Sequence, residues 1–381
     1  MSRVTKGQED FSLSGFTGLP QRFLDIRAKV FQGERISPQE GIFLFEEGGL
    51  GFLGMLADIV RKRKNGDHAS FIRNFHIEPT NICVNRCSFC SYSHHFSKTK
   101  WELTVEEMLG KVGEQETTVR ELHITGAVHP DRDIIYYGDL LKRIRGMRPA
   151  LHLKAYSAVE LDYMIRKAGM EVKEALSYLK ECGLDSIPGG GAEIFDEELR
   201  KEICGMKSSS RAWLEIHETA HALGIPSNAT ILYGHRESFA QRIDHLDRLR
   251  LLQDRTGGFN AFIPLKFRNG NNEMSAIREV SVTEDMRMYA VSRIYLDNFP
   301  HLKAYWPAIG RNFARVALSF GVDDLDGTIN DSTRIYSSAG SAETSPVMTV
   351  SAMVAMIREA DRVPVERDSL YNTIHVYGKE S

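Results

Sequence analysis

The feature that most constrains the fold is an alternation of short apolar segments with longer amphipathic segments between residues 73 and 325. The short segments have the length and composition of strands. They lie at 73–79, 119–127, 151–157, 184–191, 226–234, 259–267, 302–310 and 322–328. Segments with helical spacing separate them, at 104–115, 134–147, 159–182, 210–224, 237–257, 283–298 and 311–321. This alternation predicts repeated βα units around a parallel sheet.

About eight such units follow one another, which fits a closed (βα)8 barrel of the TIM type better than an open doubly wound sheet. No GxGxxG motif follows the first predicted strand, so the dinucleotide-binding form of the open sheet is disfavoured. We therefore expect an α/β protein in three parts: an N-terminal helical extension at 1–72, the barrel at 73–325 and a C-terminal extension at 326–381. The last part has one clear helical segment, 347–362, which we expect to pack on the barrel.

Composition excludes several classes of protein. The chain has 381 residues, a formal net charge of −3, 42% apolar residues and 26% charged residues, which is ordinary for a globular protein. The near-neutral charge does not favour nucleic-acid binding. The apolar stretch 41–60 is interrupted by Glu46 and Glu47, and the N-terminus lacks the apolar core of a signal peptide. We expect a cytoplasmic protein that binds neither membranes nor nucleic acid.

Three of the five cysteines form a C-x3-C-x2-C cluster directly after the first predicted strand: Cys83, Cys87 and Cys90. Barrel enzymes place their chemistry at the carboxyl ends of strands, so the cluster lies where an active site is expected. Cys182 and Cys204 lie in helical segments, and we interpret both as small buried hydrophobic residues.

The cluster allows four interpretations. Three thiolates at this spacing can bind three irons of a [4Fe-4S] cluster and leave the fourth iron open to a substrate. Zinc could be bound by the three cysteines with His94 or His95, although a second C-x2-C pair is missing. The last two cysteines could form a thioredoxin-like C-x-x-C, which leaves Cys83 unexplained. All three could be unliganded packing residues, which is unusual in so polar a loop.

The C-x3-C-x2-C segment, with Phe89 at the aromatic position before the last cysteine, resembles the radical S-adenosylmethionine (SAM) superfamily. Within it, six segments are similar to the aminofutalosine synthase family of menaquinone biosynthesis. They are HITGAVHPD (123–131), SIPGGGAEIF (186–195), SNATILYGH (227–235), the stretch 245–267, PHLKAYWPAIG (300–310) and ALSFGVDDLDGTI (317–329). The motifs at 233–235, 263–265 and 323–328 favour this family over its sisters, cyclic dehypoxanthinylfutalosine synthase and FO synthase.

The resemblance implies a transferase whose cofactors are a [4Fe-4S] cluster bound by Cys83, Cys87 and Cys90, and SAM as co-substrate. The implied substrate is 3-[(1-carboxyvinyl)oxy]benzoate, to which the 5′-deoxyadenosyl radical adds. The implied products are 6-amino-6-deoxyfutalosine, methionine and CO2 or bicarbonate. An external one-electron donor of the flavodoxin or ferredoxin type would reduce the cluster. The sister enzymes act by hydrogen abstraction instead.

The same resemblance assigns SAM-binding residues. Phe89 accompanies the cluster, and the Thr125–Gly126 turn would contact the amino group of SAM. Ala127 departs from the glycine that the family usually has in this turn. Residue chemistry suggests two further sets for the adenosyl part. Gly189, Gly190 and Gly191 would allow close backbone approach, although a flexible turn also explains them. Ser157 and Glu193 would bind the ribose hydroxyls, although a solvated acid at a helix start explains Glu193 equally well.

The implied substrate carries two carboxylates, which need charge-assisted hydrogen-bond donors. Candidates near predicted strand ends are His76, His123, His129, His235, Lys266, Arg268 and Arg311. Of these we favour His235 for substrate or proton-transfer contact and Arg311 for bidentate binding of a carboxylate. Asp324 and Asp326 are acceptors near the last strand, although turn chemistry also explains them.

Overall fold

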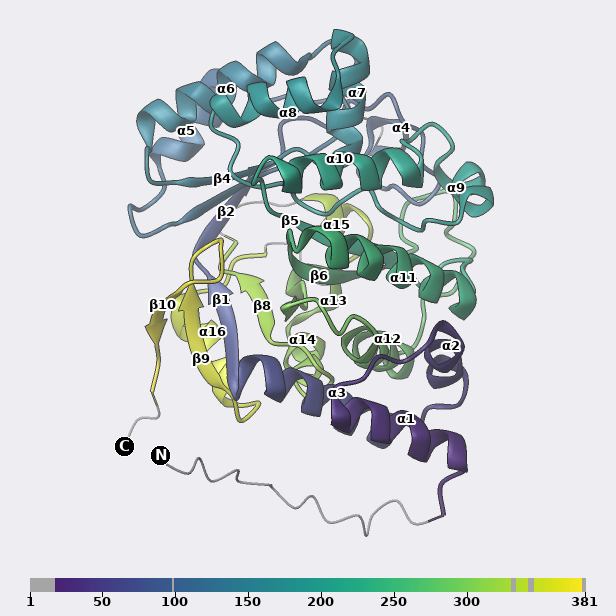
Figure 1. Ribbon diagram of the computed structural model, residues 1–381. Helices are drawn as coiled ribbons and strands as arrows, with labels where there is room; N and C mark the ends of the chain where they lie inside the picture. Colours follow the sequence, from purple (N-terminus) through teal and green to yellow (C-terminus); the bar gives the residue numbers. More distant parts are fainter. Residues whose placement is uncertain (1–17, 98, 330–333, 342–345, 379–381) are drawn as a thin grey trace.

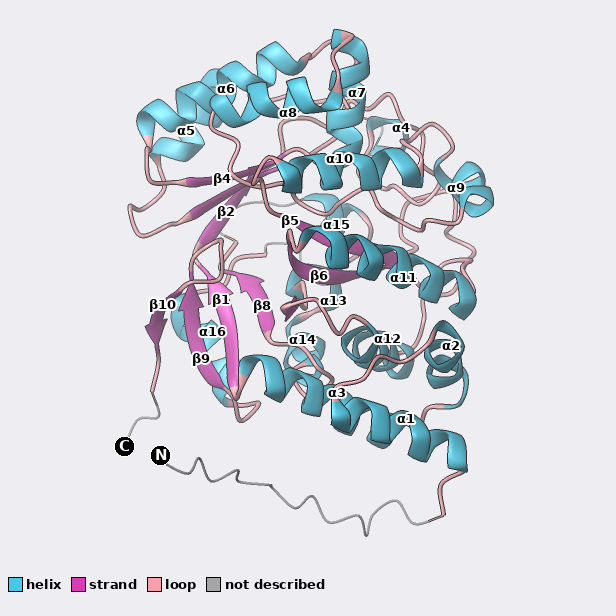
Figure 2. Ribbon diagram, in the orientation of Figure 1, coloured by secondary structure: helices cyan, strands magenta, loops and turns pink. Residues whose placement is uncertain are grey.

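The computed structural model describes residues 18–97, 99–329, 334–341 and 346–378. Parallel strands alternate with helices around a barrel (Figure 1, Figure 2). The strands are β1 (His68–Ile72), β2 (Asn74–Ile77), β3 (Glu121–Ile124), β4 (His152–Ala155), β5 (Ser227–Tyr233), β6 (Phe259–Lys266), β7 (His301–Leu302) and β8 (Asp324–Gly327).

The barrel wall is continuous. β2, β3 and β4 pair in parallel, as do β5, β6 and β7. Between β4 and β5, Ser186 bridges to Lys154 and Ile187 bridges to Ser227. Lys303 bridges to β8, and β8 pairs with β1, which runs into β2 after a single residue. The predicted (βα)8 barrel is confirmed.

Helices connect successive strands on the outside of the barrel (Figure 2). They are α4 (His94–Ser97), α5 (Val105–Gly113), α6 (Ile134–Met147), α7 (Ala158–Ala168), α8 (Val172–Glu181), α9 (Glu197–Cys204), α10 (Ser210–Ala222), α11 (Phe239–Thr256), α12 (Val282–Tyr295), α13 (Trp306–Ile309) and α14 (Arg311–Ala317). Side-chain caps fix where many of them begin. Thr104 before α5 and Ser238 before α11 each form a capping box that satisfies free backbone N–H groups of the first turn.

The remaining elements flank the barrel. At the N-terminus are α1 (Gln21–Gln32), α2 (Pro38–Glu47) and α3 (Leu50–Asn65), with α2 against α11 and α3 against α12. At the C-terminus are α15 (Arg334–Ser338), α16 (Val350–Arg358), β9 (Val363–Arg367) and β10 (Thr373–Val376). None of the helices described is long and apolar enough to cross a membrane.

The predicted strand at 73–79 is confirmed as β2, and β1 is an additional strand that pairs with both β8 and β9. Two local expectations need correction. The segment 302–310 is mostly not a strand, because Trp306–Ile309 forms a helix with a proline in its first turn. β9 and β10 extend the sheet outward from β1, whereas the sequence indicated one helix in this region. The division of the chain into three parts stays a prediction.

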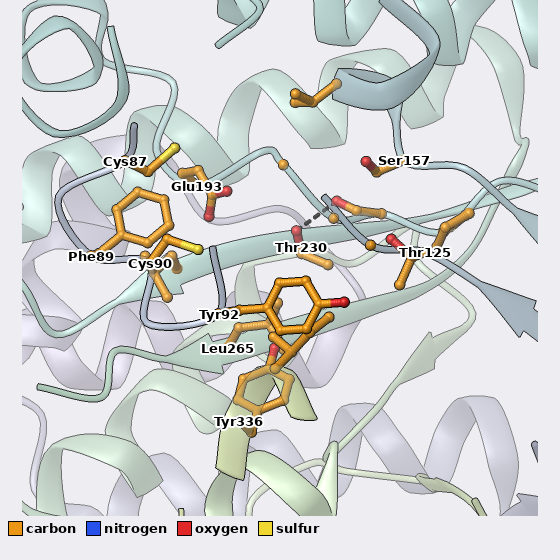
Figure 3. A pocket seen from close by; sticks show the side chains of 18 of the residues that line it. Cys87, Phe89, Cys90, Tyr92, Thr125, Ser157, Glu193, Thr230, Leu265 and Tyr336 are labelled. Carbon is orange, nitrogen blue, oxygen red and sulfur yellow. Dashed lines mark hydrogen bonds between the residues drawn. The ribbon is translucent and has the colours of Figure 1, made fainter. Parts of the chain in front are cut away.

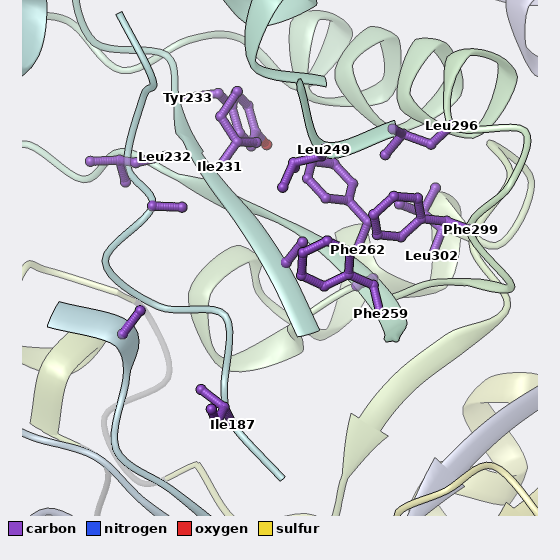
Figure 4. Packing of buried hydrophobic residues seen from close by; sticks show 14 of the residues in the cluster. Ile187, Ile231, Leu232, Tyr233, Leu249, Phe259, Phe262, Leu296, Phe299 and Leu302 are labelled. Carbon is purple, nitrogen blue, oxygen red and sulfur yellow. The ribbon is translucent and has the colours of Figure 1, made fainter. Parts of the chain in front are cut away.

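Aromatic and aliphatic side chains fill the space between the barrel wall and its helices. Figure 4 shows such a cluster around β5 and β6. Phe259 stacks on Phe299 with ring centroids 5.4 Å apart, and Phe262 meets the same ring edge-on at 6.1 Å. These three rings and Leu302 are buried. Burying an apolar side chain of this size contributes about 1.5–3 kcal/mol, so this packing holds β6 and β7 in place.

Candidate active site

A cavity of about 290 Å³ opens at the carboxyl ends of the barrel strands (Figure 3). The loop after β2 contributes Cys83, Cys87, Phe89, Cys90 and Tyr92 to its wall. Other strand ends contribute Thr125, Gly126, Ser157, Gly189, Gly190, Gly191, Glu193, Thr230, Leu265 and Lys266. All the residues that the sequence suggested for binding the iron–sulfur cluster and SAM therefore line this cavity.

Contacts to two neighbouring segments, α4 and the end of α9, hold the backbone of the cysteine loop. The backbone N–H of Cys83 donates to His94 Nδ1 over 3.1 Å, and His95 Nε2 lies 3.0 Å from the Cys83 carbonyl. Ser88 N–H donates to the Ile203 carbonyl at the end of α9 over 2.9 Å. The two histidines thus bind the backbone of the loop, and the three thiols form no disulfide.

The cysteines suit an iron–sulfur cluster in their chemistry. Burial raises the pKa of the Cys83 thiol and raises that of Cys87 further. Such thiols stay protonated until they bind a metal, and binding releases the proton and leaves the thiolate as the ligand. Within the described residues, no three His, Cys, Asp or Glu side chains converge as a single-ion site requires. A [4Fe-4S] cluster makes a different demand, since each of its thiolates binds a different iron.

The ends of β3 and β4 are tied together by Glu160, which the sequence did not indicate. Its carboxylate accepts hydrogen bonds from Thr125 Oγ1 at 3.1 Å and from the Gly126 N–H at 3.3 Å. It also accepts from Ser157 N–H at 2.8 Å and Ser157 Oγ at 2.6 Å. Ala127 has no positive φ, so the departure from glycine there brings no backbone strain.

Close packing requires two of the three glycines after Ile187, Gly189 and Gly191. A Cβ on Gly189 would lie 2.6 Å from the Asn228 carbonyl oxygen on β5, and one on Gly191 would collide with Val159. Gly191 also has φ +83°, a conformation that favours glycine. At Gly190 the nearest atom to an added Cβ, in Ser157, is 3.7 Å away. This part of the wall is therefore backbone rather than side chain.

Glu193 lies beside the cysteine loop (Figure 3) and forms an ion pair with Lys207. Lys207 Nζ is 2.5 Å from Glu193 Oε1, and both side chains line the cavity. Lys207 was not predicted, because it follows a helix rather than a strand and no motif surrounds it in the sequence.

His235 and Arg311, the two residues we favoured for catalysis, do not line the cavity. The His235 ring turns back into its own loop, with Nε2 3.0 Å from the Leu232 carbonyl and Nδ1 3.3 Å from Glu237. Burial lowers the pKa of this histidine. Arg311 begins α14 and donates to the Val347 carbonyl over 3.2 Å. Both expectations are corrected: a position after a strand does not determine where the side chain points.

Other polar residues near the strand ends line the cavity instead of His235 and Arg311. His76, His123, Lys266 and Arg268 line the cavity, whereas His129 does not. Residues His76, His123 and Lys154 sit in register on the adjacent strands β2, β3 and β4. Burial lowers the pKa of His123 well below its ordinary value, so the ring is neutral at pH 7.

Lys154 and Lys303 were not predicted for the site, although a lysine inside an otherwise apolar strand is a signal that the sequence offered. Both line the cavity. Lys154 Nζ lies 2.5 Å from Glu121, and Lys303 Nζ lies 2.5 Å from Asp326. Asp326 also lines the cavity, as an ion-pair partner rather than a free acceptor.

Comparison with known proteins identifies the family. Residues 77–249 match the radical SAM superfamily, and residues 256–379 match the CofH/MqnC C-terminal region. The aminodeoxyfutalosine synthase of Thermus thermophilus is 42% identical over 94% of this chain and 97% of its own. The cyclic dehypoxanthine futalosine synthase of Streptomyces coelicolor is 36% identical over 91% of this chain and 87% of its own.

Solved structures show the same fold. The crystal structure of methylornithine synthase (PylB) matches with a TM-score of 0.69 at 16% identity, over 88% of this chain and 95% of that one. A [4Fe-4S] cluster and SAM are the cofactors of this superfamily, and the zinc, thioredoxin-like and packing interpretations are set aside. The chain belongs to the radical SAM superfamily, and within it to the family of enzymes that includes the aminodeoxyfutalosine synthases.

Proposed function

We propose that this enzyme joins the 5′-deoxyadenosyl group of SAM to 3-[(1-carboxyvinyl)oxy]benzoate and forms 6-amino-6-deoxyfutalosine, with release of methionine and CO2 or bicarbonate. When bound, the cluster would supply the electron that splits the carbon–sulfur bond of SAM and yields the radical that adds to the vinyl group, and it would take one electron back as the carboxylate leaves as CO2 or bicarbonate. The name of the Thermus thermophilus relative, aminodeoxyfutalosine synthase, which is 42% identical over nearly the whole chain, supports this product.

The observation that carries the proposal is that one cavity contains both the three thiols and a set of cationic side chains. Lys154, Lys266 and Arg268 line it, while their partners Glu121, Asp285 and Glu279 are not part of the lining. Each of these three cations therefore faces the cavity, while the carboxylate that pairs with it does not line the cavity. An aromatic ether with two carboxylates needs such charge-assisted donors in a partly dry site.

The rest of the wall is suited to hold a flat, uncharged ring. Ile263 and Leu265 of β6, together with Val128 and Val159, contribute apolar side chains to the cavity lining. Such a lining excludes water and orients the alkene, and both effects favour addition of a radical carbon over its quenching. An external one-electron donor of the flavodoxin or ferredoxin type completes the proposed system.

The test is anaerobic turnover of the iron-reconstituted protein with SAM, titanium(III) citrate and 3-[(1-carboxyvinyl)oxy]benzoate, followed by mass spectrometry. We expect a product that contains both the adenosyl group and the benzoate ring. A Cys87→Ala variant should cleave no SAM. Turnover of that variant at the wild-type rate would show that the cluster assignment is wrong.

A second candidate is a hydrogen-abstracting reaction of the sister type, because relatives at 36% identity carry the names cyclic dehypoxanthine futalosine synthase and 5-amino-6-(D-ribitylamino)uracil--L-tyrosine 4-hydroxyphenyl transferase. Such an enzyme would release free 5′-deoxyadenosine as the main adenosyl product. Methionine and free 5′-deoxyadenosine without an adduct would therefore refute the addition reaction and favour this candidate.

A further inference from the structure

Lys207 is a largely shielded cation beside the cysteine loop that the proposed reaction does not use. It follows α9 and lines the cavity together with Cys83, Cys87 and Cys90. Its Nζ lies 5.2 Å from the centre of the Phe89 ring, which stands between the last two cysteines of the motif. The Lys207 side chain is 15% exposed and that of its partner Glu193 is 10% exposed. The pair is therefore largely shielded from solvent.

The charge of Lys207 is firmly held and acts on the thiols. Burial on its own lowers the pKa of the Lys207 ammonium, but the adjacent Glu193 carboxylate raises it above its ordinary value. The Lys207 ammonium and the Glu193 carboxylate line the same cavity as the Cys83, Cys87 and Cys90 thiols. The thiols thus lie in the field of one fixed cation and one fixed anion.

We propose that the Lys207–Glu193 ion pair sets the reduction potential of the [4Fe-4S] cluster bound by the three cysteines. Lys207 raises the potential and Glu193 lowers it. Reduction adds one electron from a low-potential donor and takes the cluster from the 2+ to the 1+ state, and no bond forms or breaks. The added negative charge is stabilised by a nearby cation and destabilised by a nearby anion. This inference does not depend on the substrate, so it is separable from the proposed function.

The expected effects of the two partners have opposite signs. Lys207→Met removes the cation and should shift the midpoint potential to a more negative value. Glu193→Gln removes the anion and should shift it to a more positive value. We expect each shift to correspond to about a tenfold change in the ratio of reduced to oxidised cluster at a fixed potential, or about 59 mV for one electron. Lys207→Arg retains the charge and should stay near the wild-type potential.

The experiment is an anaerobic potentiometric titration of each reconstituted holoenzyme with titanium(III) citrate, without substrate, read by the electron paramagnetic resonance signal of the reduced cluster. Iron and sulfide content verifies equal cluster loading. If Lys207→Met does not fold or load, the positive shift of Glu193→Gln still tests the proposal. The Lys207→Met/Glu193→Gln double variant has the wild-type net charge and should return toward the wild-type potential. Single variants that leave the potential unchanged, or move it in the same direction, would overturn the proposal.

Discussion

At the scale of the residue, the least ordinary group near the cavity is the Glu160 carboxylate. It is buried, and the ion pairs of the described residues do not include it. The hydroxyl protons of Thr125 and Ser157 both point to it. The remaining lone pairs of these hydroxyls are therefore free to accept hydrogen bonds. That is the polarity needed to bind the ammonium and ribose hydroxyls of SAM, which are donors.

Glu160 should make stability depend on pH. Burial raises the pKa of Glu160 to about 7 against the lowering effect of its hydrogen bonds, while an unfolded glutamate titrates near 4.5. The unfolded chain therefore loses this proton first, and stability falls as pH rises from about 4.5 to about 7 and then levels off. The Glu160→Gln variant has no carboxyl group to titrate, so its stability does not fall in this way as pH rises. Between pH 5.5 and pH 8 the wild type should lose about 2 kcal/mol relative to the variant in urea unfolding. A stability difference that is independent of pH would contradict the raised pKa.

The sequence could predict site residues whose role follows from their position on the backbone. It could not predict residues whose role depends on the direction in which the side chain points. Cys83 and Thr125 were found because the loop after a barrel strand must lie at the active end. His235 occupies an equally promising position, but Leu232 and Glu237 hold its ring away from the cavity. Lys207 was missed because its neighbours in space, Glu193 and Phe89, are distant in the sequence.

At the scale of the element, the loop after Ile187 is shaped by the strand beside it. Thr230 Oγ1 of β5 donates to the Gly189 carbonyl over 2.6 Å, and Trp213 Nε1 of α10 donates to the Gly190 carbonyl over 3.2 Å. The Leu232 N–H donates to the Glu193 carbonyl over 2.8 Å. The loop is therefore a backbone extension of the barrel wall, pinned at three points, rather than a mobile turn.

The glycines of this loop differ in whether the surrounding structure leaves room for a side chain. Gly189→Ala places a Cβ against the backbone of Asn228, which cannot rotate away, so we expect a loss of about 1–3 kcal/mol in the free energy of unfolding. Gly190→Ala meets nothing closer than 3.7 Å and is the matched control, with an expected change within about 1 kcal/mol. Urea unfolding of the two variants measures the difference. Equal losses would mean that the loop relaxes as a whole.

The barrel helices and strands could be predicted because each carries its own periodicity and caps. The short strands at the end of the chain could not. β9 contains Pro364 and alternates poorly, and β10 is exposed along its length, so neither has a sequence pattern of its own. β9 forms because β1 offers it a partner edge. That edge exists only once the barrel has closed. The pairing of β9 with β1 therefore cannot be predicted from the local sequence.

At the scale of the whole molecule, a buried chain of charges connects the cavity to the C-terminal extension. Lys303 pairs with Asp326 at the cavity wall and lies 3.7 Å from Asp324 on the same strand. Asp324 Oδ2 is 2.5 Å from Arg367 Nε, and Arg367 is the last residue of β9. The Arg367 guanidinium also covers the Tyr371 ring, 3.9 Å from its centre. The extension therefore neutralises a carboxylate inside the barrel.

Arg367→Leu should destabilise the whole barrel, not only the extension. The substitution leaves the fully buried Asp324 carboxylate with one cation, the more distant Lys303. Removal of one partner of a buried ion pair costs about 3–5 kcal/mol of stability. The control is Arg315→Leu, because Arg315 also joins the barrel to the extension by an ion pair with Glu359. Both of those side chains are largely exposed, so the expected loss is about 0–1 kcal/mol.

The measurement is the free energy of unfolding in urea, with Asp324→Asn/Arg367→Leu as a third variant. Removal of both charges leaves no unpaired carboxylate at Asp324, so the double variant should recover part of the stability that Arg367→Leu loses. Similar losses for Arg367→Leu and Arg315→Leu would mean that water reaches Asp324. The base of the barrel would then be open, and the extension would be a surface addition rather than part of the fold.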